Sequence, residues 1–365
     1  MKRRHFIKGA AVGAVAAAST TFPTPAISSS TRELKLVTTW PKNFPGLGTG
    51  AQRLADRISA GSGGSLTVKL FAAGELVPPF ESFDAVSSGT ADMYHAAEYY
   101  WQGKSKGFNF FAAVPFGLTV TEMDAWVHHG GGQALWDELS AGFNIKPFLA
   151  GNTGVQMGGW FNKEINSLED YKGLKIRMPG LGGEVLRRIG AAAVSLPGGE
   201  IMPALQSGAI DATEWVGPWN DLAFGFYKVT KYYYYPGFHE PGTALGSGVN
   251  LDVWNSLTSD QQSLIATCMA AENNVTLGEF NARNGAALNT LLTDHGVELK
   301  KFSSGVLQAI GEAAGGVVAE AGATDAMTQK IYNSFIDFRS KAIGWSKLSD
   351  QAYWNARILP FKYGS

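Results

Sequence analysis

Four polar residues in the second half of the chain stand at or near the ends of predicted strands: Gln156, Arg177, Glu214 and Glu240. In α/β proteins, ligands bind in the crevice beyond the carboxyl ends of the strands. Arg177 lies in a short β-run, 174–178, on the face opposite its apolar neighbours. An arginine there can grip a carboxylate with two hydrogen bonds of about 1.5–3 kcal/mol each. A surface salt bridge is the alternative for any single arginine.

Glu214 is embedded in an aromatic stretch that includes Trp215. A buried carboxylate must be paired, protonated or bound to a cation, because leaving it charged and alone is costly. Glu240 closes an apolar run in the same way. Two glutamates and the side-chain oxygen of Gln156 suit a hard cation such as Na⁺ or Ca²⁺, which takes oxygen ligands. A direct ion pair between Arg177 and Glu214 is the simpler alternative.

Candidate acid/base pairs are few. Asp124 and His128 stand four residues apart on a predicted helix, with His129 beside them, a pattern more typical of an exposed helix face than of catalysis. His95 and Glu98 lie near a strand end, without a third partner at a usable spacing. Neither pair therefore predicts an active site.

The glycine-rich segment 179–183 joins a predicted strand to a predicted helix and superficially resembles a dinucleotide-binding turn. Val185 or Leu186 occupies the place of its third glycine, and no fitting acidic residue follows about twenty positions on. The sequence contains no nucleophile elbow, P-loop, His-Glu-x-x-His or paired-cysteine motif. Acyl-transfer, NTPase and zincin chemistry therefore have no support.

The elements that position these residues alternate between β-rich runs and helical stretches, which indicates an α/β fold. The chain has 365 residues, a length typical of two domains. Hydrophobic residues make up 45% and charged residues only 17%, so the chain can bury large cores. Strands at 34–40, 65–71 and 91–96 form two βαβ units, which predicts a twisted open sheet, and a long helix is expected over 123–139.

Two lobes with mixed sheets are expected. Around 145–160 an apolar strand is followed by a glycine-rich stretch, and the chain is predicted to cross there into a second lobe covering 151–244. A strand near 245–251 is predicted to return, so that the first lobe comprises 34–150 plus about 245–285.

The last part of the chain is predicted to be helical. Thr258 and Gln261 form a capping-box pattern that opens a long helix ending near Leu292. Residues 286–365 are expected to form a C-terminal helical region that packs on the lobes or on a second subunit.

Residues 1–26 are typical of a cleavable export signal. The adjacent Arg3 and Arg4 match the twin-arginine pattern, and the following Ala/Gly-rich run is too short to span a bilayer. Cleavage near Ala26 removes four basic residues and no acid, which changes the net charge from -1 to -5. The sequence thus predicts a mildly acidic protein exported to the periplasm.

Charge and cysteine content exclude other classes. The 30 Lys and Arg residues balance 31 Asp and Glu residues without a concentrated basic face, which argues against a nucleic-acid partner. Cys268 is the only cysteine, so an intramolecular disulfide and a zinc site built on paired cysteines are impossible.

Several longer motifs resemble those of the extracytoplasmic solute receptors of tripartite ATP-independent periplasmic (TRAP) transporters. The similarity extends from about Leu34 to Trp354 and is closest to the branch that binds 2-oxo acids or lactate together with a cation. The segments that carry it are GNTGVQMGGWF at 151–161, KIRM at 175–178, DATEWVGP at 211–218 and KYYYYPG at 231–237, with GELVP at 74–78 and HHGGG at 128–132.

The resemblance implies a receptor without catalysis. Its fold is expected to be a two-lobed periplasmic-binding-protein-like α/β fold with mixed sheets, crossover strands and long C-terminal helices. It is expected to capture a small monocarboxylate by cleft closure and to deliver it to the TRAP membrane subunits. This ligand is either a 2-oxo acid such as pyruvate, or lactate, a 2-hydroxy acid. Arg177 matches the arginine that grips the substrate carboxylate, and Asn152 and Tyr100 match positions that contact the substrate.

The same resemblance implies a cation, Na⁺ or Ca²⁺, and no organic cofactor. Gln156, Glu214, Glu240 and the main-chain carbonyl of Trp215 match the positions around the cation, which also touches the acid, so that Gln156 and Trp215 belong to the substrate site as well. The pattern of these receptors leads us to expect a bulky aromatic residue at position 239, where this chain has His239. This departure bears on substrate identity and on cation preference.

Two further readings stay open. A periplasmic metal-dependent enzyme acting on a 2-oxo or 2-hydroxy acid is the alternative function, because twin-arginine export often serves proteins that fold around a cofactor. Against it, the polar residues contain no obvious nucleophile or general base. The helical region 306–343 is a possible surface for a homodimer.

Overall fold

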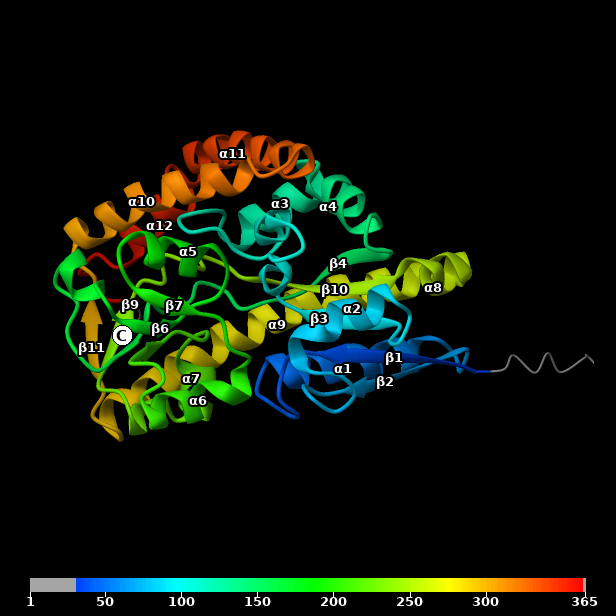
Figure 1. Cartoon of the computed structure of the whole chain (residues 1–365), viewed down its shortest axis with the longest axis horizontal. Coiled ribbons are helices and arrows are strands. Elements are labelled where there is room, and N and C mark those ends of the chain that lie inside the picture. The colour runs from blue at the N-terminus through cyan, green and yellow to red at the C-terminus, as the bar shows by residue number, and fades with distance from the viewer. Residues whose placement is uncertain (1–30, 364–365) are drawn as a thin grey trace, which may run out of the picture. The chain divides into compact units, whose positions relative to one another are not determined.

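The structure, a computed structural model, describes residues 31–363, so the signal predicted at 1–26 lies outside the described residues. Its strands form two sheets (Figure 1). In the first sheet, in the order β2-β1-β3-β10-β4, the three N-terminal strands are parallel, as the βαβ pattern predicts, and β10 is antiparallel to both of its neighbours. Its strands are β1 (Arg32–Thr38), β2 (Leu66–Phe71), β3 (Met93–Ala96), β4 (Ile145–Asn152) and β10 (Ala244–Asn250), and its crossover helices are α1 (Leu47–Gly61) and α2 (Ser82–Ser87).

The second sheet has the order β11-β9-β5-β8-β6-β7 and consists of short strands. It is also mixed: β6 runs parallel to β7 and β8, whereas β5 is antiparallel to β8 and β9. Its strands are β5 (Gly159–Phe161), β6 (Lys175–Arg177), β7 (Ala192–Val194), β8 (Ala212–Thr213), β9 (Tyr232–Tyr235) and β11 (Glu298–Lys301). β11 pairs with β9, so the region 286–365 contributes a strand as well as helices.

The chain passes between the sheets three times; two passages, after β4 and before β10, run along neighbouring strands, and the third leads from β10 to β11. It leaves the first sheet at the end of β4 and returns at the start of β10, which pairs with β4. Beyond the sheet the two segments stay hydrogen-bonded: the amide of Thr153 donates to the carbonyl of Thr243 at 3.1 Å, and that of Gln156 to the carbonyl of Glu240 at 3.1 Å. Side chains from both passages therefore meet at one place between the sheets.

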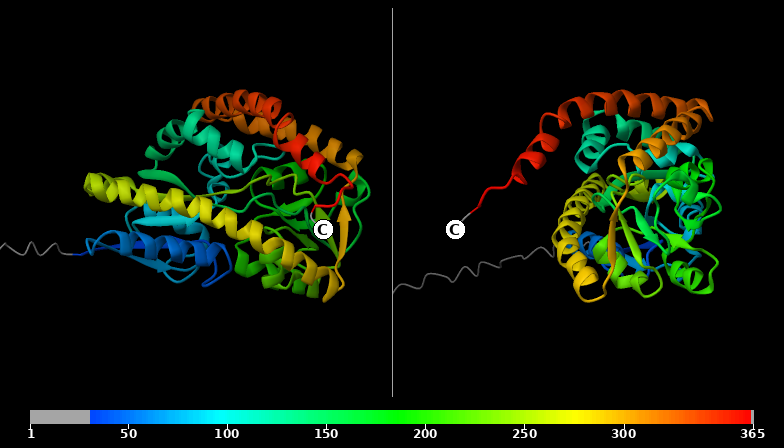
Figure 2. Two further views of the ribbon diagram at one scale, coloured as in Figure 1. Left: turned by 180° about the vertical axis from the view of Figure 1, so that it is seen from behind. Right: turned by 90° about the vertical axis from the view of Figure 1, so that its left-hand side faces the viewer.

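A long helix, α9 (Ser259–Thr293), accompanies both sheets (Figure 2). It contacts α1 and β4 of the first sheet and α7 (Pro218–Phe224), which follows the second sheet's β8. Its N-terminus has the predicted capping box, in which the amide of Gln261 donates to the Thr258 hydroxyl at 3.2 Å and the amide of Thr258 donates to the Gln261 side chain at 3.1 Å. The single continuous helix α9 thus contacts elements that belong to both sheets.

One predicted helix is two helices in the structure. The pattern over 123–139 is divided into α3 (Val120–His129) and α4 (Gly132–Ala141), because Gly130 and Gly131 interrupt it and Gly131 has a φ of +87°. The helical periodicity is correct on both sides of the break. Glycines 130–132 are a local turn signal, which the prediction passed over because the helical periodicity continues on both sides.

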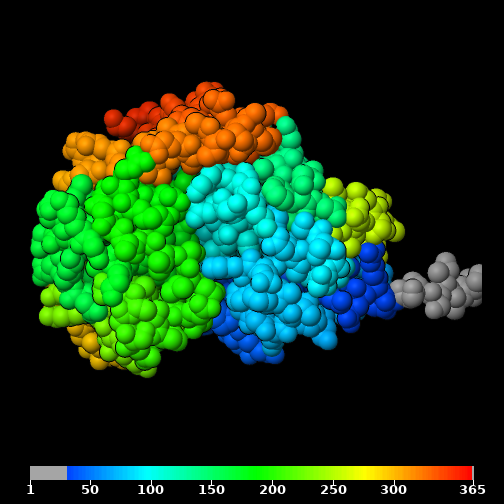
Figure 3. Space-filling model, viewed as in Figure 1, coloured from blue at the N-terminus to red at the C-terminus, as the bar shows by residue number. Residues whose placement is uncertain are grey.

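The C-terminal helices lie across segments of both sheets (Figure 3). α10 (Ser304–Gly322) packs on α5 (Gly180–Arg188), whereas α11 (Ala326–Ser346) packs on α3 and α4, and α12 (Asp350–Arg357) follows it. The remaining helices are α6 (Gly198–Ser207) and α8 (Leu251–Ser256), with short 3₁₀ turns η1 (Pro79–Glu81), η2 (Glu98–Trp101), η3 (Lys106–Phe111), η4 (Leu168–Tyr171) and η5 (Phe226–Lys228). Over residues 31–363, no helix has the length and apolar character needed to cross a bilayer.

Candidate functional site

A small enclosed cavity lies at the place where the two sheets meet. Loops that follow or precede strands of both sheets build its wall, as expected for α/β crevices. Its volume is about 10 Å³, which is room for roughly one water molecule. The lining residues are Trp40, Leu47, Tyr99, Tyr100, Thr153, Gln156, Trp215, Val216, Thr243 and Leu245.

Arg177 ends β6 directly beside this cavity and is 1% exposed. Its guanidinium pairs with the Glu214 carboxylate and donates to the main-chain oxygens of Glu214 at 3.1 Å and of Leu196 at 3.2 Å. Its second terminal nitrogen donates to the Tyr100 hydroxyl at 3.3 Å, and the guanidinium carbon lies 5.0 Å from the centre of the Trp215 ring. The ion pair with Glu214 that the sequence left open is thus formed, and the fork also reaches the cavity wall.

The charge of Arg177 is secure in this setting. Burial alone would lower the pKa of its guanidinium, but the charge of Glu214 and the neighbouring tyrosines more than offset this and raise it. Burial also raises the pKa of Tyr100 to about 12, so its hydroxyl keeps its proton at neutral pH. The site therefore offers a fixed positive charge beside a neutral hydroxyl, which suits an anionic ligand.

Glu214, His239 and Glu240 form a buried cluster next to Arg177. One ligand atom of each lies within 4.8 Å of those of the other two. A ring nitrogen of His239, Nε2, is 3.2 Å from Glu214 Oε2, and Glu240 accepts a hydrogen bond from the Thr243 hydroxyl. Burial, and next the negative charge of Glu214, raise the pKa of Glu240 to about 7. A bound cation would relieve this cost, because it would neutralise the adjoining carboxylates.

Gln156 supplies the observation that tests a cation site most directly. Its amide nitrogen donates to the hydroxyls of Thr153 at 3.1 Å and Thr243 at 3.0 Å, which fixes the orientation of the amide. Its side-chain oxygen is buried and has no hydrogen-bond partner among the described residues. An unpaired buried oxygen is costly unless it meets a ligand. The residues present thus fit an oxygen-coordinated cation between Gln156 and the carboxylate cluster.

Asn152 and Trp215 are placed differently. Asn152, the last residue of β4, is fully buried and accepts a hydrogen bond from the amide of Gly154 at 2.9 Å, while its own amide nitrogen has no partner within residues 31–363. It is absent from the cavity wall. Trp215 forms part of that wall, and its ring packs edge-on against Trp40 at 6.1 Å. The structure thus places Trp215, but not Asn152, in the cavity wall.

Asp221 holds the loop that carries Glu214 and Trp215. Its carboxylate accepts from the Trp160 indole at 3.0 Å, the Tyr233 hydroxyl at 2.6 Å and the amide of Val216 at 3.3 Å. Burial raises its pKa to about 7. β5, β9 and the loop after β8 are therefore tied together at one buried group, which keeps the loop in place beside Arg177.

Sequence reasoning missed several residues of the cavity wall. Trp40 and Tyr99 line it from the first sheet, and Thr153 and Thr243 line it from the two passages between the sheets. Trp40 lies just beyond the carboxyl end of β1, so the same strand-end rule that selected Arg177 would have found it. Thr243 had no such signal, because its hydroxyl matters only through contacts with Gln156 and Glu240.

The residues of the two acid/base pairs considered in the sequence lie outside the carboxylate cluster and have other partners or face solvent. His95 accepts from the Trp40 indole at 2.8 Å, and burial lowers its pKa, so it is a neutral link inside the core. Glu98 accepts instead from the Tyr94 hydroxyl at 2.7 Å. His128 is exposed on α3, whereas Asp124 accepts from the side chain of Asn273 at 3.1 Å. None of these residues joins the cluster around Arg177.

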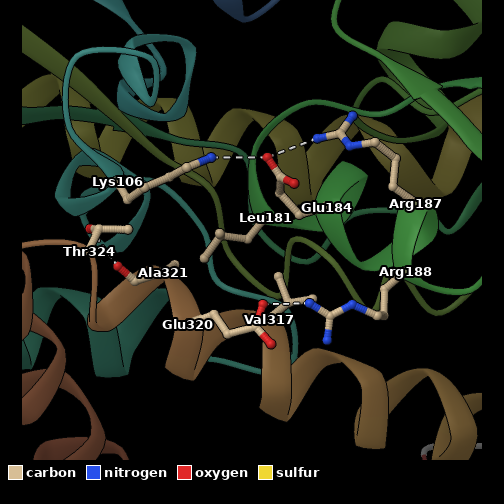
Figure 4. Close-up of a pocket in the computed structure, with 9 residues that line it drawn as sticks. All are labelled: Lys106, Leu181, Glu184, Arg187, Arg188, Val317, Glu320, Ala321 and Thr324. Carbon is tan, nitrogen blue, oxygen red and sulfur yellow. Dashed lines mark hydrogen bonds and ion pairs between the residues drawn. The ribbon is translucent and has the colours of Figure 1, made fainter.

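A wider hollow of about 420 Å³ lies between α5 and α10 (Figure 4). Its charged side chains pair with one another: Lys106 lies 3.0 Å and Arg187 2.9 Å from Glu184, and Arg188 lies 2.5 Å from Glu320. These groups are partly exposed, where ion pairs contribute little. Despite its size, this hollow lacks a buried charge, and the small cavity beside Arg177 is the better candidate.

Comparison with known proteins identifies the family of the chain. Residues 36–325 match the family described as bacterial extracellular solute-binding protein, family 7. The chain belongs to this family.

Members of family 7 are receptors for solutes, and three of them are close to this chain. A monocarboxylate 2-oxoacid-binding periplasmic protein of Nostoc sp. is 40% identical over 360 residues, which cover 97% of this chain and 98% of that protein. A TRAP transporter solute-binding protein of Bordetella bronchiseptica, solved as a mixed-occupancy dimer with calcium and picolinate, matches with a TM-score of 0.88 and 34% identity, covering 90% of this chain and 97% of that one.

A TRAP periplasmic solute-binding protein of Pseudoalteromonas atlantica was solved with sodium and pyruvate. It matches this chain with a TM-score of 0.87 and 39% identity, and the match covers 91% of this chain and 100% of that one. The two-lobed fold with mixed sheets and long C-terminal helices expected of a TRAP solute receptor is thus confirmed. The family 7 chain described here is a solute-binding protein of this kind.

Proposed function

We propose that this family 7 receptor binds a small 2-oxo monocarboxylate, such as pyruvate, together with a cation between its two lobes. The main support for this proposal is the arrangement around Arg177. Its buried guanidinium lies beside a carboxylate cluster and near Gln156, whose side-chain oxygen has no partner among the described residues. The three relatives support the ligand class. Pyruvate and picolinate both carry a carboxylate with a second donor atom on the neighbouring carbon, a pair of atoms that can chelate one cation.

Arg177 is the proposed anchor of the ligand carboxylate. Its fork is shared between Glu214 and Tyr100. A cation held by Glu214, Gln156, Glu240 and the carbonyl of Trp215 would neutralise Glu214, which frees the guanidinium to bind the incoming acid. Tyr100 would add a hydrogen bond from the first lobe, and Asn152 lies at the edge of the site.

Lobe opening is required for entry, because the cavity of about 10 Å³ is smaller than any three-carbon acid. The two crossing segments form the natural hinge, since they are the adjacent connections between the sheets. Closure over the ligand excludes water and strengthens each electrostatic contact in the site. The closed form would be the one that TRAP membrane subunits recognise.

Calorimetry with a panel of small acids tests this proposal. The protein, stripped with a chelator, is titrated with pyruvate, lactate and acetate, each with and without Na⁺ and Ca²⁺. Binding of pyruvate that requires a cation, with acetate bound weakly, is the expected result. Absence of pyruvate binding under every cation condition would refute the proposal. Conversion of pyruvate to a product would instead favour the metal-dependent enzyme, the alternative left by the sequence.

We propose in addition that the twin-arginine signal at 1–26 exports the folded receptor. Family membership supports a location outside the cytoplasm, and the paired Arg3 and Arg4 support the route. Replacement of both arginines by lysine should retain the precursor in the cytoplasm, as cell fractionation would show, whereas an unaffected periplasmic pool would exclude this route.

A homodimer is the proposed assembly, through a surface later in the chain than the sequence indicated. Much of the apolar face of 306–343 is buried on its own chain, as Ile310 and Phe335 show. Residues 343–363 instead expose large apolar side chains, and α12 projects from the end of α11 (Figure 2). A concentration of exposed apolar residues of this kind is typical of an interface. These residues are Ile343, Trp345, Leu348, Tyr353, Trp354, Ile358, Leu359, Phe361 and Tyr363.

A further inference from the structure

His95 connects the wall of the small cavity to the interior of the first sheet. It lies on β3 and is 1% exposed. The Trp40 indole donates to its Nδ1 at 2.8 Å, and its Nε2 lies 3.2 Å from the carbonyl oxygen of Ala150 on β4. An indole N–H can only donate and a carbonyl can only accept, so Nδ1 is the acceptor and Nε2 carries the proton. Both ring nitrogens of a neutral imidazole are thus used, each in a fixed role.

The carbonyl that His95 reaches belongs to an irregular position of β4. The pairing of β4 with β10 skips Ala150, which has no opposite residue in the ladder. The extra residue of such a bulge is left unpaired by the neighbouring strand. Because β10 lies between β3 and β4, the imidazole bridges two strands that are not neighbours. His95 therefore ties Trp40 to the end of β4, just before the chain leaves the first sheet.

Trp40 is held between this hydrogen bond and two other aromatic residues of the cavity. It is 2% exposed, and its ring centre lies 6.1 Å from that of Trp215 and 6.2 Å from that of Tyr100. Rotation of the indole would leave its buried N–H without a partner, which is costly. The orientation of the ring thus depends on His95, which is itself absent from the cavity wall.

The cavity wall has a polar and an apolar part, and Trp40 belongs to the apolar part. The polar lining residues include Thr153, Gln156 and Thr243, whereas the apolar ones include Leu47, Val216 and Leu245. In the proposed function the carboxylate and the cation occupy the polar part, so the carbon chain of the acid faces the apolar part. An aromatic ring that cannot turn away there leaves little room for a longer chain.

We propose that His95 is a positioning residue that fixes the Trp40 ring against the cavity and thereby limits the chain length of the 2-oxo acid. This role presupposes the proposed function, because the ligand class comes from there. It assigns the selection of ligand length to a residue that does not touch the ligand.

Two conservative variants separate the two hydrogen bonds of His95. In His95→Asn, the side-chain oxygen takes the place of Nδ1 and can accept from Trp40, but the side chain is too short to reach Ala150. In His95→Gln, the amide nitrogen takes the place of Nε2 and can donate to Ala150, but Trp40 loses its acceptor. A role confined to support of the bulge predicts that only His95→Gln resembles the native protein, whereas the proposed role predicts this of His95→Asn.

Calorimetry with pyruvate, 2-oxobutyrate and 2-oxovalerate, each with Na⁺ or Ca²⁺, measures the selection by length. We expect the native protein and His95→Asn to bind pyruvate at least about tenfold more tightly than 2-oxovalerate, and His95→Gln to lose most of this discrimination. In a Trp40→Phe background, which lacks the indole donor, His95→Gln should change the ratio of the two affinities no further. Chemical denaturation confirms that each variant is folded.

Spectra of protein with ¹⁵N-labelled tryptophan give a readout that does not depend on the ligand. The indole N–H signal of Trp40, identified by its absence from Trp40→Phe, should keep its position in His95→Asn and shift in His95→Gln. A native protein that binds both acids equally, or discrimination that survives in His95→Gln, would overturn the assignment of His95 and leave the proposed function intact. A greater loss of discrimination in His95→Asn than in His95→Gln would do the same. No pyruvate binding by the native protein with any cation would instead remove the proposed function itself.

Discussion

At the residue scale, the side chain of Arg177 serves both stability and the proposed ligand binding. It balances the buried charge of Glu214 and, in the proposed function, holds the ligand carboxylate. Removal of one partner from a buried ion pair leaves the other charge unbalanced, which typically costs about 3–5 kcal/mol. A binding residue here is consequently also a residue on which folding depends.

Arg177→Met is therefore expected to abolish pyruvate binding and to lower the free energy of unfolding by about 3–5 kcal/mol. The double variant Arg177→Met, Glu214→Gln removes both charges and should recover much of the lost stability without recovering binding. Chemical denaturation and calorimetry separate the two effects. Near-native pyruvate affinity in either variant would exclude Arg177 from the site.

Glu98 is another buried carboxyl, and it does not line the cavity of the proposed site. Burial raises its pKa from 4.5 to about 8, and the Tyr94 hydroxyl donates to its Oε1. It packs against the first sheet at Gly246, where a Cβ atom would lie 2.2 Å from that oxygen. Because the folded state holds this proton more tightly than the unfolded state, Glu98 makes stability fall as the pH rises from about 4.5 to 8.

Glu98→Gln should remove this dependence. Relative to the native protein, the variant should gain stability between pH 5 and pH 8 by a few kcal/mol, at about 1.4 kcal/mol per pKa unit. Asp221, whose pKa is also raised, titrates in both proteins and cancels in the comparison. Thermal unfolding at a series of pH values measures the difference. A difference that does not vary with pH would show that Glu98 is ionised in the folded state.

At the scale of elements, the start of α5 is one place where segments of the two lobes approach closely. Gly180 has a φ of +61°, and a Cβ atom there would lie 3.1 Å from the Cβ of Tyr99, which lines the cavity. Asn220 of α7 likewise donates to the carbonyl of Pro45 at 3.0 Å. In the proposed closure these contacts hold the lobes together, so their fit bears on ligand binding.

Gly180→Ala should weaken pyruvate binding, because the added methyl group obstructs the approach of Tyr99. Gly208→Ala is the matched control: Gly208 has a similar φ, +71°, and nothing lies within 4 Å of its Cβ position. Both variants should lose about 1–2 kcal/mol of stability from the left-handed backbone, but only Gly180→Ala should lose ligand affinity. Equal affinities in the two variants would show that the contact does not limit closure.

At the scale of the whole molecule, the proposed ligand site and the proposed dimer surface lie in different parts of the chain. The ligand site draws on the crossings between the sheets, whereas the exposed apolar residues gather in 343–363. The substantial contacts of α12 within the described chain are with α11. The end of the chain is thus available for a second copy without disturbing the site.

Removal of residues after Ser346 is expected to convert the proposed dimer into a monomer with unchanged pyruvate affinity. Light scattering coupled to gel filtration measures the mass of both proteins. The milder variant Trp354→Ser, Ile358→Ser, which keeps the chain length, controls for loss of the helix itself. A monomeric full-length protein, or a dimer that survives both changes, would place the interface elsewhere or remove it.

Much of the architecture was predictable from the chain itself. The βαβ rhythm gave the parallel strands β1, β2 and β3, and Thr258 with Gln261 gave the start of α9. Strand ends also selected Arg177 and Glu214, which form an ion pair in the structure. The strand β11 was missed, because a strand at a sheet edge depends on neighbours distant in sequence. The break at Gly131 was missed although glycines 130–132 signal a turn locally.

The sequence by itself determined the family, the alternation of strands and helices, and the residue types that suit an acid and a cation. Each follows from local periodicity or from motifs within one segment. Only the tertiary structure decided which of these groups meet. It joined Arg177 to Glu214 and Tyr100, set His239 beside the carboxylates, and left the oxygen of Gln156 unpaired. Those contacts link segments far apart in the chain, and their energies arise from burial, which no single segment possesses before the fold forms.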